Sequence, residues 1–220
     1  MRIRLGSSKT FLALMACLLS LSSFSPVRAA VPHDGNLDFT VLRDGDEIGS
    51  HRLHFSNGEE GLRVDIKTNI QVKMMFITAY RFEHDGHEIW RDGRLTRLWS
   101  KTNDDGKKHD LNVAAAGGKL VVEGDGKRDD APAEIVPASL WNENILKGGT
   151  ILNTLDGRGM KVAVKNMGAD VIEARGHRIQ ATHYAITGDL ERELWFDSNA
   201  VLVKVRFKGN DGSEIQYVLR

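Results

Sequence analysis

The chain has 220 residues, its 30 Lys and Arg residues equal its 30 Asp and Glu residues, and 41% of all residues are hydrophobic. This length and apolar content are sufficient for one sizeable core. The charge balance speaks against a nucleic-acid-binding protein, because such proteins carry a basic excess on one face.

Residues 1–29 are predicted to be a secretory signal peptide. The segment has a basic start, an apolar run and a small-residue cleavage signal, formed by Arg2, Arg4 and Lys9, then residues 11–24, then Val27-Arg28-Ala29. We expect cleavage after Ala29. The apolar run is short for a membrane span, and no second run of its length follows. We therefore expect an exported mature chain without a membrane span.

Cys17 is the chain's only cysteine and lies inside this segment. The sequence Leu14-Met15-Ala16-Cys17 resembles a lipoprotein processing box, which would make Cys17 a lipidated first residue. Against this alternative, apolar residues continue beyond Cys17 to Phe24. Cleavage after Ala29 would leave a mature chain with 26 basic and 30 acidic residues and no cysteine. Disulfides, thiol catalysis and thiolate metal sites would then be excluded.

Asp-Gly pairs recur along the rest of the chain. They are Asp34-Gly35, Asp44-Gly45, Asp85-Gly86, Asp92-Gly93, Asp105-Gly106, Asp125-Gly126, Asp156-Gly157 and Asp211-Gly212, with Asn57-Gly58 as a related pair. These dipeptides tolerate a positive φ and suit the tight turns of antiparallel hairpins. Several lie between runs that alternate apolar and polar residues. The pattern predicts a single antiparallel β domain over residues 30–220.

The first predicted strands are residues 37–41 and 48–55, joined by a turn at Asp44-Gly45. Residues 62–82 then carry an apolar or aromatic side chain, or a threonine, at every even position. Such alternation predicts extended chain with one buried face. The segment is far longer than a usual strand, so we expect it to be bent, coiled or bulged. Curved strands of this kind favour a strongly bent sheet or an open β-barrel of hairpins and meanders.

Further hairpins are expected over residues 89–122, followed by a charged loop at 124–137. Ser139 is predicted to cap one short helix, residues 140–147, which ends at Gly148. The remaining predicted strands are residues 161–164, 171–174, 179–187, 190–196, 201–208 and 213–219. The fold class is therefore all-β, mainly antiparallel, with one short helix.

Metal-site candidates are weak. His84 and His87 flank a predicted turn at Asp85-Gly86 and could bind zinc, but an exposed polar hairpin tip is the better explanation. His51 and His54 are three apart on a strand, so they point to opposite faces. The acidic clusters at 103–110 and 125–130 match no calcium-binding spacing. We predict no metal site and no cofactor.

Catalytic signatures are also missing from the sequence. There is no Gly-x-Ser-x-Gly motif and no Gly-rich phosphate loop between a strand and a helix. Glu191 and Glu193 are placed on one face of a predicted strand, as paired glycosidase carboxylates could be. Charged residues on the outer face of a meander give the same pattern. We predict no catalytic residue.

Large apolar side chains give the one binding prediction. Curved sheets can hold a small apolar ligand, and the predicted lining residues are Met74, Phe76, Trp90, Trp99, Trp141 and Trp195. Packing in an ordinary core is the alternative. Trp141 lies on the predicted helix, which could act as a plug or lid across the concave face.

Five stretches carry a family resemblance. They are Val41-Leu42-Arg43-Asp44-Gly45 with Ile48-Gly49-Ser50-His51-Arg52, then residues 88–95, the turn at 102–106, Leu140-Trp141-Asn142, and residues 190–197 around Leu194-Trp195-Phe196-Asp197. With these the mature chain resembles the bacterial exported family called domain of unknown function 6134. The resemblance implies a Gram-negative periplasmic β protein and brings no activity, ligand or catalytic residue with it.

The sequence thus favours a non-enzymatic periplasmic binding or envelope-associated module. Its expected partner is an apolar or amphiphilic small molecule, or an envelope protein. Two alternatives remain: a hydrolase acting on an envelope polymer, which needs a polar cleft with converging His or carboxylate groups, and a protein-interaction module that uses strand addition at a sheet edge.

Overall fold

The computed structural model of the chain describes residues 31–74 and 77–220. The predictions for the signal peptide, Cys17 and Phe76 fall outside these residues. For Met74, the structure describes the backbone only.

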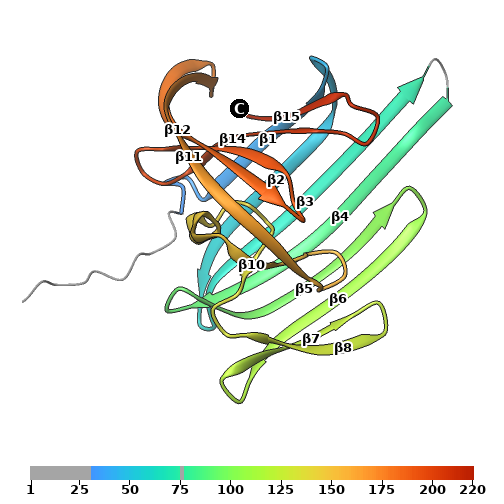
Figure 1. Cartoon of the computed structure of the whole chain (residues 1–220), viewed down its shortest axis with the longest axis vertical. Coiled ribbons are helices and arrows are strands. Elements are labelled where there is room, and N and C mark those ends of the chain that lie inside the picture. Colours follow the sequence, from blue (N-terminus) through green and yellow to red (C-terminus); the bar gives the residue numbers. More distant parts are fainter. Residues whose placement is uncertain (1–30, 75–76) are drawn as a thin grey trace, which may run out of the picture.

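The described residues form one sheet of fifteen strands with a single 3₁₀ turn, η1 (Figure 1). The strands are β1 (Asn36–Arg43), β2 (Asp46–Gly58), β3 (Gly61–Met74), β4 (Ile77–Arg91), β5 (Arg94–Asp104), β6 (Lys107–Ala116), β7 (Lys119–Gly124), β8 (Lys127–Pro132), β9 (Val136–Pro137), β10 (Gly149–Leu152), β11 (Gly159–Ala174), β12 (His177–Gly188), β13 (Arg192–Asp197), β14 (Leu202–Lys208) and β15 (Glu214–Leu219). Their order in the sheet is β8-β7-β6-β5-β4-β3-β2-β1-β15-β14-β13-β12-β11-β10-β9. Every neighbouring pair is antiparallel except β9 and β10.

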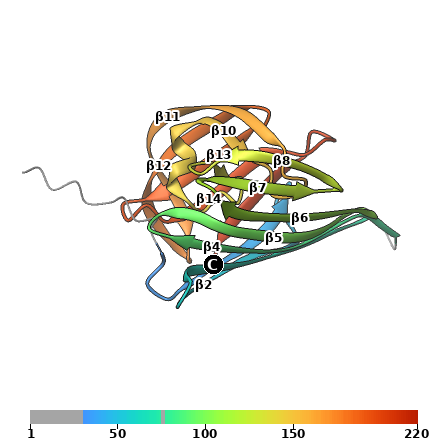
Figure 2. The same ribbon diagram turned by 90° about the horizontal axis from the view of Figure 1, so that it is seen from below.

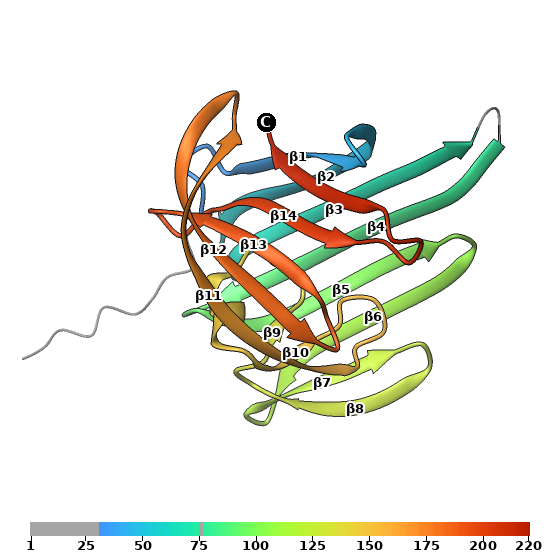
Figure 3. The same ribbon diagram turned by 45° about the horizontal axis from the view of Figure 1, so that its top comes forward.

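The sheet curls until its two halves face each other (Figures 2 and 3). Strands β1–β8 form one wall, and β10–β15 cross in front of it as the other. The β3–β4 hairpin and the β5–β6 hairpin extend beyond the second wall, so the shell is open at that end. The prediction of a mainly antiparallel, strongly bent, barrel-like sheet is confirmed.

The core fills the space between the walls. Side chains at alternate positions face inward, so Val64 and Ile66 of β3 are buried against residues such as Leu194 and Val205 of the opposite wall. Burial of each large aliphatic side chain contributes about 1.5–3 kcal/mol. In nearly every strand, the apolar residues at alternate positions point into the same core. The alternation in the sequence therefore determines which face of the sheet is concave.

The segment between β10 and β11 closes the shell on one side. Ser100 Oγ on β5 donates a hydrogen bond of 2.6 Å to the backbone oxygen of Thr154. A Cβ at Gly124 would lie 2.2 Å from the backbone oxygen of Asp156. A Cβ at Gly157 would lie 2.4 Å from Val122. Glycine is required at both positions because the two walls approach each other this closely.

Most predicted turns are confirmed. At four Asp-Gly pairs both residues have a positive φ, as a type I′ hairpin turn requires; these are Asp44-Gly45, Asp92-Gly93, Asp105-Gly106 and Asp125-Gly126. The final meander, β13–β15, also forms as expected.

Asp85-Gly86 is not a turn, and this prediction was wrong. The pair lies in the middle of β4, where Gly86 is in register with Ile66 of β3 and Ser100 of β5. A Cβ at Gly86 would lie 2.7 Å from His84 Nε2. Gly86 therefore does not form a turn. Its missing side chain leaves room for the His84 imidazole.

The predicted helix over 140–147 is shorter and of another type. Only Glu143–Lys147 forms a 3₁₀ turn, and its N-cap is Asn142, whose side chain accepts a hydrogen bond of 3.0 Å from the Asn144 backbone N–H. Leu140 has a φ of 68°, which interrupts any helix that starts at Ser139. Gly148 ends the turn as predicted.

Three strand assignments also need correction. Residues 62–82 form two strands, β3 and β4, rather than one bent strand. Within the predicted loop at 124–137, β8 pairs with β7 and, as an edge strand with no second neighbour, shows no apolar alternation. The two short strands predicted around 161–174 are one strand, β11, with a bulge between Asn166 and Gly168 that breaks the alternation.

Candidate functional site

The structure brings together two of the four tryptophans predicted to bind a ligand. The Trp90 and Trp141 rings meet edge to face at 5.5 Å, and Trp141 packs in the same way on Phe55 at 5.1 Å. Both indoles are buried within the core. Trp141 thus belongs to a segment that seals the concave face at the closed end, and its predicted role as a ligand contact remains a prediction.

Glu88 lies at the centre of this group and is fully buried. Its Oε2 accepts hydrogen bonds from Trp90 Nε1 at 2.8 Å and from Trp141 Nε1 at 2.9 Å. Burial raises the pKa of the Glu88 carboxyl, while Ser139, Trp141 and Trp90 lower it more weakly. Neither Glu88 Oε1 nor Ser139 Oγ makes a hydrogen bond within the described structure. Glu88 therefore fastens the segment around Trp141 to β4.

Trp99 and Trp195 lie on the other, convex face, so they cannot share a cavity with this pair. Each ring stacks on a histidine of the neighbouring strand: Trp99 on His87 at 4.8 Å, and Trp195 on His183 at 4.2 Å. Trp195 is buried beneath its neighbours and donates a hydrogen bond of 2.9 Å to Asp170. Trp99 is half-buried.

A row of histidine and threonine side chains crosses the concave face. His51, Thr68, His84, Thr102 and His109 occupy consecutive strands from β2 to β6 and are each in register with the next. All five are buried. We call this row the His–Thr belt. Sequence analysis missed it because its members are 7 to 18 residues apart, and only the strand register aligns them.

Each imidazole of the belt is held through Nδ1. His51 Nδ1 lies 2.7 Å from Thr68 Oγ1, His84 Nδ1 lies 2.8 Å from Thr102 Oγ1, and His109 Nδ1 lies 2.6 Å from Asp125 Oδ2. Within the described structure, the three Nε2 atoms make no side-chain hydrogen bond, and none of them is a fully buried atom without a partner. They consequently keep some contact with solvent.

Burial keeps two of these rings neutral. It lowers the pKa of His51 to about 3, with a smaller contribution from His84, and it lowers the pKa of His84 to about 4. A neutral ring held at Nδ1 presents one defined nitrogen to the concave face. The belt offers hydrogen bonds at neutral pH rather than positive charge.

The belt does not form a metal site. Its histidines are two strands apart, or roughly 10 Å, and no group of three potential ligands occurs in residues 31–74 and 77–220. His84 and His87 point to opposite faces, as their spacing of three in one strand requires. A zinc site between them is therefore ruled out by the geometry.

Beyond the belt, the concave face at the open end carries side chains that the core does not cover. They are half-buried and mainly apolar or aromatic: Ile70, Val72, Tyr80, Phe82, Arg192, Phe207 and Tyr217. We call this set the open-end patch. Tyr217 joins it to the belt, because its ring lies 5.1 Å from that of His51. Gly49 of β2 is in register with Ile70 and has no side chain, so nothing from this position separates the open-end patch from the belt.

Arg192 is the charged member of the patch. Its guanidinium lies 3.7 Å from the centre of the Phe207 ring and donates a hydrogen bond of 2.7 Å to the backbone oxygen of Glu191. No carboxylate in the described residues lies within ion-pair distance of it, and residues 1–30 and 75–76 contain no Asp or Glu. Burial lowers the pKa of Arg192, which marks a cation held in a poorly solvated place.

Tyr217 lies near this cation. Burial raises the pKa of Tyr217, and Arg192 opposes the rise. Burial and then the carboxylate of Asp104, which accepts a hydrogen bond of 2.8 Å from the Tyr80 hydroxyl, raise the pKa of Tyr80. Both phenols stay protonated near neutral pH, but the Tyr80 hydroxyl already donates to Asp104, so Tyr217 is the phenol that can donate a hydrogen bond to a bound anion.

Glu191 and Glu193 differ in their surroundings. Glu191 precedes β13, while Glu193 lies within it and is bound by Arg206 at 2.5 Å. The Glu193 carboxylate is therefore already engaged by an arginine.

Comparison with known proteins agrees with this architecture. The model of a domain of unknown function, DUF6134, matches residues 39–220. The chain belongs to this family. No curated protein matches the DUF6134 chain. A solved structure titled "Crystal Structure of Beta-barrel-like Protein of Domain of Unknown Function DUF1849 from Brucella abortus" is similar, with a TM-score of 0.59 and 11% identity over 84% of this chain and 95% of that one. At this identity the likeness concerns the fold alone.

The DUF6134 chain has a single helical element in its described part, the 3₁₀ turn η1. Within residues 31–74 and 77–220, no helix has the length and apolar character needed to cross a bilayer.

Proposed function

We propose that this DUF6134 protein is an exported, non-enzymatic binding module whose open-end patch holds an amphiphilic molecule with an anionic group. The observation that carries the proposal is Arg192, a guanidinium half-buried on the concave face without a carboxylate partner. The predicted signal peptide supports a periplasmic location.

Arg192 lacks a carboxylate partner, and leaving it unpaired has a cost in free energy. A charged group withdrawn from water is unfavourable unless it is paired and hydrogen-bonded. The Phe207 ring and one backbone oxygen satisfy only part of the guanidinium. A carboxylate, sulfate or phosphate group fits the remaining donors, because arginine binds such groups through two parallel hydrogen bonds.

The rest of the patch is mainly apolar. Ile70 and Val72 of β3 and Phe82 of β4 are only half-buried, and the β3–β4 hairpin projects beyond the second wall (Figure 3). An acyl chain or another apolar body would remove their remaining surface from water, at about 25 cal/mol per Å². The anionic group would then lie near Arg192, and the apolar body would extend along β3 and β4.

Two other hypotheses receive less support. Strand addition requires a free edge, but the β8 edge carries Arg128, Asp129 and Asp130 and ends at Pro132, which are features that block such pairing. A hydrolase requires converging groups, but the belt histidines are separated from one another, and Glu88 is fully buried.

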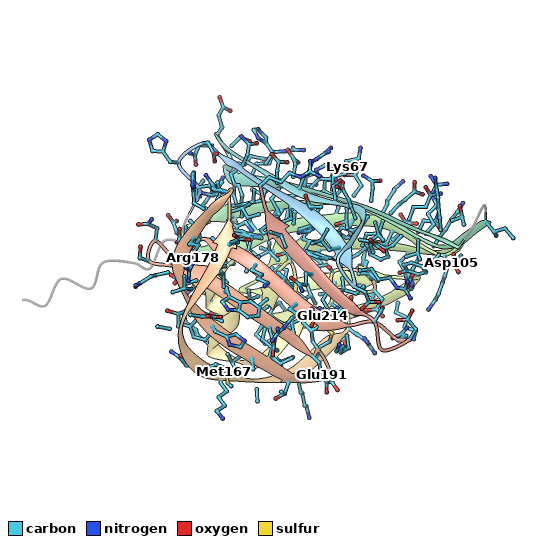
Figure 4. The ribbon with its side chains drawn as sticks, turned by 90° about the horizontal axis from the view of Figure 1, so that it is seen from above. Lys67, Asp105, Met167, Arg178, Glu191 and Glu214 are labelled. Atoms are coloured by element: carbon cyan, nitrogen blue, oxygen red, sulfur yellow. The ribbon has the colours of Figure 1, made fainter. Side chains whose placement is uncertain are left out.

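The test is calorimetric titration of the mature chain with dodecanoate below its micelle concentration. Dodecanol serves as the uncharged comparison of the same length. We expect dodecanoate to bind and the Arg192→Met variant to bind it at least tenfold more weakly, the loss expected for a charge-assisted hydrogen bond. Arg178→Met is the matched control, because Arg178 is exposed on β12 at the end of the molecule away from Asp105 (Figure 4). Equal binding by Arg192→Met, or tighter binding of dodecanol, would refute the proposal.

A further inference from the structure

The convex face carries a second feature, which is separate from the open-end patch. Five outward side chains on consecutive strands lie in register across β4 to β8: His87, Trp99, Asn112, Glu123 and Arg128. A groove of about 1120 Å³ runs along the part of this row that includes Trp99, Asn112, Glu123 and Arg128. We call it the Trp99 groove.

The Trp99 ring is held in this groove by contacts with its neighbours. His87 stacks on the ring at 4.8 Å and 22°, and the His87 imidazole is held in turn by Asp65 at 2.5 Å. The guanidinium groups of Arg63 and Arg97 each lie 5.5 Å from the centre of the Trp99 ring. His87 belongs to β4, on one side of Trp99, while Asn112 of β6 is in register with Trp99 on the other side and lines the groove.

The charges of the groove favour an anion. Four of its cations, Arg97, Lys101, Lys108 and Lys127, have no carboxylate within ion-pair distance among the described residues. Of its three carboxylates, Glu123 is paired with Arg128 at 2.7 Å, Asp125 is hydrogen-bonded to His109 at 2.6 Å, and Asp110 is the third. Even if Asp125 and Asp110 both count as unpaired, the four unpaired cations exceed them.

We infer that the Trp99 groove binds an acidic oligosaccharide. The Trp99 indole is only half-buried, and its ring face, which carries negative charge, suits the C–H groups of a sugar ring. The Asn112 amide can both donate to and accept from hydroxyl groups. The four unpaired cations are spread along the groove, as successive sugar carboxylates or phosphates along a chain would require.

Single-stranded nucleic acid is the competing occupant, since aromatic stacking and a basic groove also suit it. Single-stranded nucleic acid carries a phosphate on every nucleotide, so some of its phosphates would lie next to the carboxylates of Asp110 and Glu123. A sugar chain with hydroxyl groups between its charges can instead donate hydrogen bonds to those carboxylates. The mixture of amide, carboxylate and cation in the groove therefore favours the acidic sugar.

The experiment is calorimetric titration of the mature chain with oligogalacturonate. The comparison ligands are a neutral glucose oligomer of the same length and oligothymidylate. We expect binding of oligogalacturonate that weakens as salt is raised and falls about tenfold or more in Trp99→Ala. Trp99→Phe should recover part of the affinity. The double variant Lys101→Gln/Lys108→Gln should lose several-fold.

Lys67→Gln is the matched control, since Lys67 is an exposed cation of the same convex wall outside the groove (Figure 4). Its affinity should equal that of the wild type. The absence of oligogalacturonate binding, equal binding by Trp99→Ala, or tighter binding of oligothymidylate would each overturn the inference. The Arg192→Met variant should bind the sugar normally, so this site and the open-end patch can fail independently.

Discussion

Replacement of His51 tests the idea that the His–Thr belt is buried and neutral. Burial lowers the pKa of His51 from its ordinary value of 6.5 to about 3. Above pH 6.5 the ring is neutral in both the folded and the unfolded chain, so it does not affect how stability depends on pH. Between pH 6.5 and about pH 3, His51 is protonated in the unfolded chain but not in the folded protein. This proton uptake stabilises the unfolded chain, so the free energy of unfolding falls as pH falls.

The size of the effect follows from proton linkage. Each pH unit in this window costs about 1.4 kcal/mol, so His51 alone should lower the free energy of unfolding by about 2 kcal/mol between pH 7 and pH 5. A His51→Gln variant lacks this proton uptake and keeps a polar group near Thr68. The difference in stability between wild type and variant should therefore shrink by about 2 kcal/mol over that range.

The measurement is urea unfolding of both proteins at pH 7, 6 and 5. The comparison of two proteins matters because other groups titrate in both. The raised pKa of Glu88 acts in the opposite sense: the folded protein retains that proton to a higher pH than the unfolded chain, so its contribution is lost as pH rises. A stability difference that stays constant from pH 7 to pH 5 would refute the burial of a neutral His51.

Substitutions at two further positions, Glu88 and Gly86, test the core around the site. Glu88→Ala should lower the free energy of unfolding by about 3 kcal/mol or more, since it leaves a cavity and two buried indole N–H groups without an acceptor. Glu88→Gln should cost much less because its amide oxygen can accept both bonds, and chemical denaturation that gives equal losses for the two variants would contradict this role. Gly86→Ala should destabilise by about 1–3 kcal/mol, because its Cβ would meet His84 Nε2 at 2.7 Å. NMR titration of that variant should also show a higher pKa for His84, and an unchanged titration would show that the ring does not depend on Gly86.

The hairpin architecture could be predicted from local sequence signals. Asp44-Gly45 and Asp105-Gly106 adopt the positive φ values that such pairs tolerate, and the apolar residues Val64 and Ile66, at even positions of the alternating segment, face the core. Asp85-Gly86 shows the limit of such signals. The same dipeptide is extended here because the space above Gly86 is taken by His84, a contact that turn propensity does not describe.

The candidate sites could not be predicted in the same way. The belt and the Trp99 groove are rows across strands, so they depend on registers such as Thr68 with His84 and Trp99 with Asn112. A hairpin register can be estimated from its turn, and His84 and Thr102 could have been paired through Asp92-Gly93, except that a bulge between Ile89 and Trp90 shifts the pairing. Arg192 was missed because a single arginine at the start of a strand carries no signal until its lack of a carboxylate partner is known.

The most direct test of ligand binding is native mass spectrometry of the gently purified protein alongside its Arg192→Met variant. We predict that the wild type retains an amphiphilic molecule with a carboxylate, sulfate or phosphate group, and that the variant is recovered mainly empty. A wild-type protein recovered with no small molecule, or a variant that carries the same molecule to the same extent, would contradict this prediction.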